Sequence, residues 1–205
     1  VIARLNHKAT GDEGKDVYIH LKDTLAGLGW RLPVARVASL GCGFGALERG
    51  FASIQMATHI DGYDIADGAI AGARAAAAAE GLDSLHYHVA DLERLELPEA
   101  SYDLIFGFQS VHHISDLDRL CRMVRRALRP GGVFHLHEYV GPDRFQWTDA
   151  QLSHMNGFLL TLPERYHRLP DGIVRGPRER PLAADVIACD PTEAVRSSQI
   201  VATVE

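Results

Sequence analysis

Apolar residues form short continuous runs and helical stripes that alternate through the middle of the chain. The continuous runs predict five strands, at residues 34–40, 58–63, 85–90, 102–108 and 133–140. Stripes at helical spacing predict helices between the strands, at residues 46–53, 67–80 and from the N-cap Ser115 to Leu128. Strands that alternate with helices predict an α/β fold with a doubly wound, mostly parallel sheet and helices on both of its faces.

The pattern is weaker on either side of this core. A helix is predicted at residues 12–28, and two more at 149–162, with Thr148 as the N-cap, and at 182–188. The mostly apolar segment Ile200–Val204 predicts a further strand.

Charge and cysteine content narrow the classes of function. The chain has 205 residues and a formal net charge of −6, and no long basic run offsets it, whereas nucleic-acid binding needs a concentrated positive surface. Its cysteines, Cys42, Cys121 and Cys189, are odd in number and have no metal-binding spacing, so we expect neither disulfides nor a metal site. No apolar run approaches the ~20 residues of a membrane span. We therefore expect a cytoplasmic protein that acts on a small molecule, without nucleic acid or a membrane; its oligomeric state stays open.

Three glycines, at 41, 43 and 45, join the first predicted strand to the following helix. Glycine permits a tight turn and a close approach of the backbone to a ligand, and the helix start offers free N–H groups. Asp64 ends the second predicted strand and Asp91 the third. The carboxyl ends of neighbouring parallel strands form the ligand crevice of open α/β sheets, so we expect these features to converge there. As an alternative, either aspartate could serve only as a cap or turn residue.

Five motifs in this order resemble the S-adenosylmethionine (SAM)-dependent methyltransferases of the Rossmann-like class. They lie between Val34 and Val140, at residues 37–45, 62–65, 89–92, 102–105 with 111–114, and 128–132. The resemblance implies that Gly41, Cys42 and Gly43 cradle the methionine part of SAM. It further implies the contacts of six other side chains: Asp64 with the ribose, Ile65 against the adenine, Asp91 and Leu92 at the adenine edge, and Phe108 and Gln109 under the sulfonium. The chain departs from the family at Ser39, where an acid usually helps to position the ligand's amino group.

Methyl transfer to a hydroxyl benefits from a general base, and histidine titrates near the working pH. His113 is our first candidate, followed by His112 and Glu138, which lie after the fourth strand and at the end of the fifth. The acceptor is expected to be small and polar and to be methylated at oxygen or nitrogen by in-line displacement. Three aromatic residues that follow the fifth strand are candidates for the wall of the acceptor site: Tyr139, Phe145 and Trp147.

Three other functions are compatible with parts of the sequence. A nicotinamide-dependent oxidoreductase also carries G-x-G-x-x-A, which Gly41, Gly43 and Ala46 match, but this chain lacks a Tyr-x-x-x-Lys pair. A non-catalytic SAM-binding sensor or partner subunit would share every cofactor motif. A metal enzyme could use His135 and His137 together with the histidines at 112 and 113.

The resemblance also predicts how the chain is divided. We expect an N-terminal helical cap at residues 1–33, a SAM-binding core at 34–140, and a lid on the acceptor side at 141–205. The family's sheet normally ends in an antiparallel hairpin, for which Ile200–Val204 is the only good candidate strand. We therefore expect a chain that is truncated near this hairpin, or an irregular hairpin between residues 172–180 and 200–204.

Overall fold

A computed structural model describes residues 2–204 of the chain, and it divides into two compact units. The first unit contains the chain up to Val111 together with Asp116–Glu138. The second contains His112–Ser115 and the chain from Tyr139 onward. We describe the two units separately.

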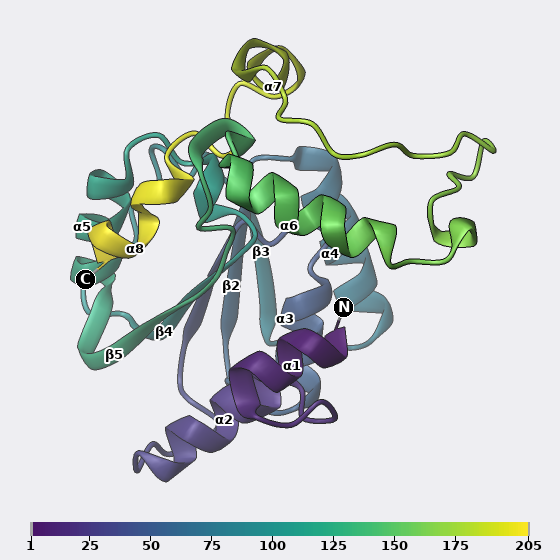
Figure 1. The fold of residues 1–205 in the computed structure, drawn as a ribbon. Coiled ribbons are helices and arrows are strands. Elements are labelled where there is room, and N and C mark those ends of the chain that lie inside the picture. Colours follow the sequence, from purple (N-terminus) through teal and green to yellow (C-terminus); the bar gives the residue numbers. More distant parts are fainter. Residues whose placement is uncertain (1, 205) are drawn as a thin grey trace. The chain divides into compact units, whose positions relative to one another are not determined.

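The first unit is built on a five-stranded, fully parallel sheet with the strand order β3-β2-β1-β4-β5 (Figure 1). The strands are β1 Val37–Leu40, β2 Ile60–Asp64, β3 Leu85–Val89, β4 Tyr102–Phe108 and β5 Leu128–His137. All four residues of β1 are buried, and so are five of the seven in β4, because these strands lie inside the sheet. The predicted doubly wound α/β fold is confirmed.

Helices of the first unit pack against different parts of this sheet. Figure 1 shows α3 and α4 beside β2 and β3, whereas α5 lies beside β5. Their bounds, with those of the two N-terminal helices, are α1 Ile2–Thr10, α2 Val17–Gly27, α3 Ala46–Ser53, α4 Asp67–Ala79 and α5 Leu117–Ala127. Alanine fills much of α4, where it allows a close approach to the sheet without loss of side-chain entropy.

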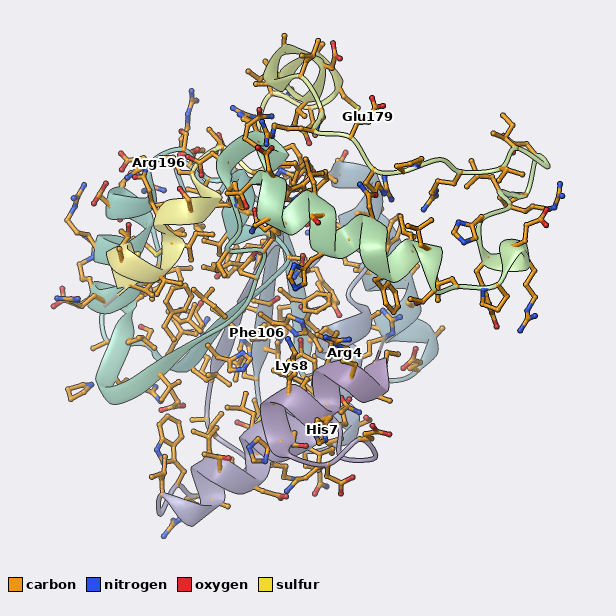
Figure 2. The ribbon with its side chains drawn as sticks, viewed as in Figure 1. Arg4, His7, Lys8, Phe106, Glu179 and Arg196 are labelled. Carbon is orange, nitrogen blue, oxygen red and sulfur yellow. The ribbon has the colours of Figure 1, made fainter. Side chains whose placement is uncertain are left out.

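The core of the first unit joins α2, α3 and α4 to one face of the sheet. Phe51 and Phe106 are 1% exposed, and their ring centroids are 4.7 Å apart. Figure 2 labels Phe106. The apolar residues of the sheet that share this face alternate along their strands, as the parallel register requires: Val37, Ile60, Leu85, Leu104 and Phe106. Ser39 belongs to the same face by this alternation, which brings it toward α3.

Several predicted boundaries need correction. The N-cap of α5 is Asp116, whose side chain accepts a hydrogen bond from the Arg119 N–H, and not Ser115. Strand β5 ends at His137 instead of continuing to Val140. The N-terminal helix begins after its cap Asp16, and the preceding helix α1 was not predicted from the sequence.

The second unit consists of helices joined by loops and short 3-10 turns. Its helices are α6 Asp149–Leu160, α7 Ala183–Cys189 and α8 Ile200–Val204, and its turns are η2 Asp143–Phe145, η3 Glu164–Tyr166 and η4 Ser197–Gln199 (Figure 1). A further turn, η1 Val111–His113, follows β4 and carries the first residues of this unit. The capping role of Thr148 is confirmed, because its hydroxyl accepts from Gln151 N and the Gln151 side chain accepts from Thr148 N.

The prediction of a strand at Ile200–Val204 is wrong, because this run forms α8. Thr203 donates its hydroxyl proton to the Gln199 carbonyl, and Ile200 is buried, so local hydrogen bonding and one apolar anchor favour the helix. The irregular hairpin is not formed either: the only bridge in the described part of 141–204 joins Arg168 to Val174. None of the helices between residues 2 and 204 has both the length and the apolar character that a membrane crossing requires.

Candidate functional site

The glycine loop leads from β1 into α3 with all three glycines at positive φ: 76° at Gly41, 51° at Gly43 and 71° at Gly45. A Cβ at Gly41 would overlap Ser110, and one at Gly45 would overlap the Tyr87 ring, so packing requires glycine at these two positions. A Cβ at Gly43 would meet no atom within 4 Å. Gly43 therefore faces open space in the middle of the loop.

Cys42 lies between these glycines, with its side chain directed toward β2. A Cβ at Gly62 would approach Cys42 Sγ to 3.0 Å, so the thiol occupies the space that this glycine leaves. Burial, followed by the negative charges of Glu48 and Asp64, raises the pKa of the thiol well above its ordinary value. Cys42 thus carries a neutral, partly buried thiol that packs against β2.

Asp64 ends β2 and binds the glycine loop. Its Oδ2 accepts from Gly43 N at 2.8 Å, and its Oδ1 accepts from Ala66 N at 2.8 Å. A carboxylate has about four lone-pair positions, so each oxygen can accept a further hydrogen bond. The next residue, Ile65, is 67% exposed, which makes it an apolar surface beside this carboxylate.

Asp91 and Leu92 follow β3. Asp91 Oδ1 accepts from Glu93 N at 2.9 Å, as a turn residue does, and Oδ2 is 3.7 Å from Arg94 Nε. The side chain of Asp91 is 39% exposed, so it remains accessible. Leu92 has its side chain buried in the core, which leaves its backbone as the part that could face a ligand.

Phe108 and Gln109 continue from β4 toward an aromatic cluster. Phe108 is 41% exposed and packs edge to face on the His137 ring, with centroids 4.9 Å apart. Gln109 has a φ of 52° and donates from its backbone N to the His137 carbonyl at 2.9 Å. Tyr18 of α2 reaches the same cluster, where its hydroxyl is 3.4 Å from His137 Nδ1. Helix α2 thus contributes to this end of the sheet.

Sequence reasoning missed Glu48, which is 1% exposed on α3. The Ser39 hydroxyl donates a short hydrogen bond to Glu48 Oε1. Glu48 Oε2 is buried and has no hydrogen-bond partner among the described residues. A buried carboxylate with an unsatisfied oxygen beside a glycine loop is costly and requires an explanation.

Glu138 follows β5 and holds the turn that leads to the candidate histidines. Its Oε1 accepts from Ser110 N at 2.5 Å and from Val111 N at 2.6 Å. Both donors belong to buried residues. The structure therefore makes Glu138 an acceptor for the start of η1.

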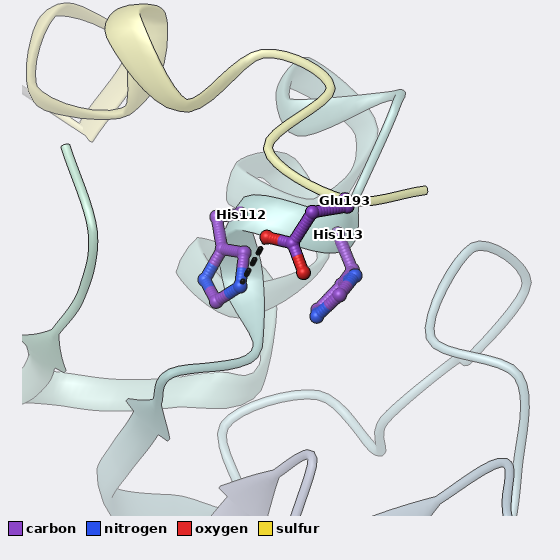
Figure 3. A group of neighbouring side chains, drawn as sticks. All are labelled: His112, His113 and Glu193. Carbon is purple, nitrogen blue, oxygen red and sulfur yellow. Dashed lines mark ion pairs between the residues drawn. The ribbon is translucent and has the colours of Figure 1, made fainter. Parts of the chain in front are cut away.

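His112 and His113 occupy neighbouring positions in η1, and Glu193 lies next to both (Figure 3). His112 is buried, and its Nε2 is 3.5 Å from Glu193 Oε1. The backbone also ties these segments together, because Val195 N donates to the His112 carbonyl at 3.1 Å. Glu193 had no signal in the sequence, since 80 residues or more separate it from both histidines.

His113 is connected to a second carboxylate through a threonine. The Thr192 hydroxyl donates its single proton to Asp190 Oδ1 at 2.6 Å. Its oxygen must therefore accept from His113 Nδ1, 3.0 Å away, which assigns the proton to Nδ1 and the lone pair to Nε2. Hydrogen bonds from the Thr192 side chain and backbone lower the pKa of Asp190, so this residue is an ionised acceptor.

Aromatic side chains form a row in the second unit. Tyr139 packs on Phe145 with centroids 5.2 Å apart, and Phe145 stacks on Trp147 at 5.6 Å with an interplanar angle of 25°. The His112 ring adjoins the row, 6.4 Å from Tyr139. This row is a partly exposed aromatic surface within the same unit as the histidine cluster.

The metal cluster considered from the sequence is not the one that the structure assembles. In residues 2–204, the group of potential ligands that converges is His112, His113 and Glu193, whose donor atoms lie within 4.8 Å of one another. His135 and His137 do not belong to it. Burial, followed by the charge of His137, lowers the pKa of His135, which keeps that imidazole neutral.

Comparison with known proteins gives a family match across the core. Residues 38–136 match the model of a methyltransferase domain. The chain is 31% identical over 147 residues to the 27-O-demethylrifamycin SV methyltransferase of Amycolatopsis mediterranei, covering 66% of this chain and 51% of that protein. It is 28% identical over 120 residues to a sterol 24-C-methyltransferase of Gibberella zeae, covering 58% of this chain and 31% of that protein. The chain thus spans about half or less of the length of these relatives.

A solved structure with the same fold belongs to a protein named for a different activity. The [4+2]-cyclase SpnF is 26% identical to this chain and aligns with a TM-score of 0.50, covering 57% of this chain and 43% of its own. The same fold is therefore found in a protein that is named for ring formation.

Proposed function

Because the chain belongs to the SAM-dependent methyltransferases of the Rossmann-like class, we propose that it transfers the methyl group of SAM to a hydroxyl group of a small molecule. The nicotinamide alternative loses its support with this membership. The net charge of −6 favours a small-molecule acceptor over nucleic acid. Three free cysteines are compatible with a reducing cytoplasm.

The residues around the glycine loop fit SAM. Gly43 faces open space, which a Cβ would fill, and Asp64 retains lone pairs for the ribose hydroxyls. The exposed Ile65 offers an apolar surface to the adenine, and Asp91 is accessible to its amino group. Cys42 contributes its backbone only. Because these groups follow the carboxyl ends of β1, β2 and β3, we propose this end of the sheet as the cofactor site.

SAM brings an activated methyl group, so the protein does not need to generate a strong electrophile. What remains for the chain is to orient the acceptor, to remove its hydroxyl proton and to exclude water. Orientation of this kind contributes about 7–11 kcal/mol, and general-base catalysis about 10²–10⁴-fold in rate.

His113 is the general base in this proposal, and the hydrogen-bonded series His113–Thr192–Asp190 is the observation that carries it. The series leaves the Nε2 lone pair of His113 to take the hydroxyl proton of the methyl acceptor. The Asp190 carboxylate then stabilises, through Thr192, the imidazolium that is formed. The His113 side chain is 31% exposed, whereas that of His112 is 8% exposed. His112, paired with Glu193, then acts as a support for the turn.

The aromatic row supplies the acceptor surface. Tyr139, Phe145 and Trp147 offer stacked and edge-on rings in the same unit as His113. Such rings bind flat or apolar groups. The acceptor that fits these features is a small molecule with one methylatable hydroxyl next to an apolar or aromatic portion.

The test is a methyl-transfer screen with phenolic and alcoholic acceptors, followed by His113→Gln on the best one. We expect kcat to fall by about 10²-fold or more, with the affinity for S-adenosylhomocysteine unchanged within about twofold. His154→Gln, on the exposed surface of α6, is the matched control. Retained turnover in His113→Gln would contradict the base assignment. Loss of wild-type turnover with a chelator would instead indicate that His112, His113 and Glu193 hold a metal ion.

A non-catalytic or non-methylating use of the same fold is the second candidate. The observation that favours this candidate is the similarity of the fold to that of a [4+2]-cyclase. Tight binding of SAM, without methyl transfer to any acceptor of the screen, would support this candidate over the transferase.

A further inference from the structure

Glu48 is a buried carboxylate whose surroundings do not explain it. Ser39 satisfies Oε1, but Oε2 has no partner among the described residues. The neighbouring Arg49 is engaged elsewhere: its Nε pairs with Glu80 at 2.9 Å, and its NH1 donates to the Phe44 carbonyl at 2.8 Å. Among the described residues, Arg49 is thus near enough to lower the pKa of Glu48 but forms no ion pair with it.

The position of Glu48 ties it to the ligand loop. Ser39 lies two residues before Gly41, at the end of β1, and Glu48 lies in the first turn of α3, three residues after Gly45. The Ser39–Glu48 pair thus joins the two segments that the glycine loop connects. Gly43, at the centre of this loop, faces open space.

Several groups beside the loop are held toward their protonated forms. Burial raises the pKa of Glu48; the Ser39 hydrogen bond and Arg49 act in the opposite direction, and Asp64 raises the pKa further. Glu48 also affects the pKa values of ionisable groups in three other segments. Burial first, with the Glu48 charge among the further causes, raises the pKa values of Tyr18 on α2, Cys42 in the loop and Tyr87 on β3. A ligand cation would relieve this accumulation of acidic groups.

We propose that Glu48, oriented by Ser39, is the counter-ion of the ammonium group in the amino-acid portion of bound SAM. The acid that the family usually has at the position of Ser39 is then relocated to the helix, with Ser39 holding it in place. This inference rests on the proposed function, because it assumes that SAM occupies the loop. A Glu48 that is protonated in the free protein loses its proton to solvent when the ammonium group binds.

Two ligands separate this role from a general effect on the site. S-adenosylhomocysteine carries the ammonium group, whereas 5′-methylthioadenosine has the same nucleoside without the amino-acid portion. In calorimetry, Glu48→Gln should weaken S-adenosylhomocysteine binding by about tenfold or more and change methylthioadenosine binding by less than about twofold. The exposed Glu99→Gln is the matched control and should change neither.

Proton release is an independent readout. Below the pH at which Glu48 ionises in the free protein, the wild type should release protons on binding S-adenosylhomocysteine, measured in two buffers of different ionisation enthalpy. Its affinity should rise with pH until Glu48 is ionised in the free protein. Glu48→Gln should show neither effect. A proton release that persists in Glu48→Gln would overturn the assignment.

Returning the acid to the strand is the complementary test. The double variant Ser39→Asp with Glu48→Ala should recover S-adenosylhomocysteine binding relative to Glu48→Ala alone. Should Glu48→Gln fail to fold, this comparison takes its place as the test of the inference. Equal weakening of both ligands by Glu48→Gln, or no weakening, would overturn the inference and leave the proposed function standing. A wild type that binds neither ligand would overturn the proposed function and this inference with it.

Discussion

Replacing Glu138 separates two roles that the sequence alone could not distinguish. One Glu138 oxygen accepts from the backbone N–H groups of Ser110 and Val111, at 2.5 and 2.6 Å. Glu138→Ala leaves both donors unpaired. Because both residues are buried, water does not readily replace the lost acceptor. A buried donor without a partner costs about 1–3 kcal/mol. The two share one acceptor, so we expect a total loss of about 2–4 kcal/mol in the free energy of unfolding.

Glu138→Gln is the informative partner of this variant. Its amide oxygen can accept from the same two N–H groups but carries no charge, so the loss in stability should be about 1 kcal/mol. If Glu138 only positions the turn before His113, the glutamine variant keeps turnover within about threefold. The alanine variant should lose about 10–100-fold, because misplacement by about 1 Å is enough for such an effect.

Urea denaturation measures the free energy of unfolding, and steady-state kinetics measures turnover on the same samples. Glu179→Ala, a surface glutamate in the second unit, is the control and should change neither stability nor turnover (Figure 2). The positioning role would be refuted if Glu138→Gln lost as much turnover as Glu138→Ala while keeping the stability of the wild type. That result would identify Glu138 as the base.

Two further substitutions test the first unit. Asp64→Ala should weaken S-adenosylhomocysteine binding by about 1–3 kcal/mol, because the ribose hydroxyls and Gly43 N lose a charged acceptor; an unchanged dissociation constant in calorimetry removes Asp64 from the site. Asp61→Asn should destabilise the fold by about 2–4 kcal/mol at neutral pH, since Arg36 and Tyr102 both donate to this buried carboxylate. Burial raises the pKa of Asp61, but these hydrogen bonds lower the pKa by a larger amount. The net shift of the Asp61 pKa is therefore downward. Its contribution is present above the unfolded value of about 3.9 and is lost as the pH falls through the folded pKa. Denaturation at a series of pH values checks this, and a stability gap between wild type and variant that persists at low pH would contradict it.

The parallel core was predictable because its signals are local. Strand β4 matches its predicted bounds at Tyr102–Phe108, since a continuous apolar run next to turn residues has few alternatives. The glycine loop was recognisable for the same reason: Gly41 and Gly45 need positive φ and leave no room for a side chain. By contrast, Ile200–Val204 is a short, mostly apolar segment whose pattern fits either a strand or a helix. The hydrogen bond from the Thr203 hydroxyl to the Gln199 carbonyl in the preceding turn η4 favours the helix.

Partners of the candidate site residues were not predictable, because they lie far apart in the sequence. Thr192 contacts His113 across 79 residues. No motif links the two segments, and a threonine in a loop has no distinctive signal. The histidine pair was found because imidazole is chemically conspicuous after a strand, whereas the groups that fix its tautomer are ordinary.

Glu48 is an intermediate case, and it shows what a departure from a family pattern can indicate. In the sequence, Ser39 indicates only the loss of an acid. Yet Glu48 lies between Leu47 and Phe51 on a helix whose other inward residues are apolar, and a carboxylate on such a face needs a partner. The alternation along β1 places Ser39 on the face that α3 covers. The two irregularities therefore explain each other: a strand that lacks its acid and a helix that carries a buried one can form a single site, because one hydrogen bond joins them.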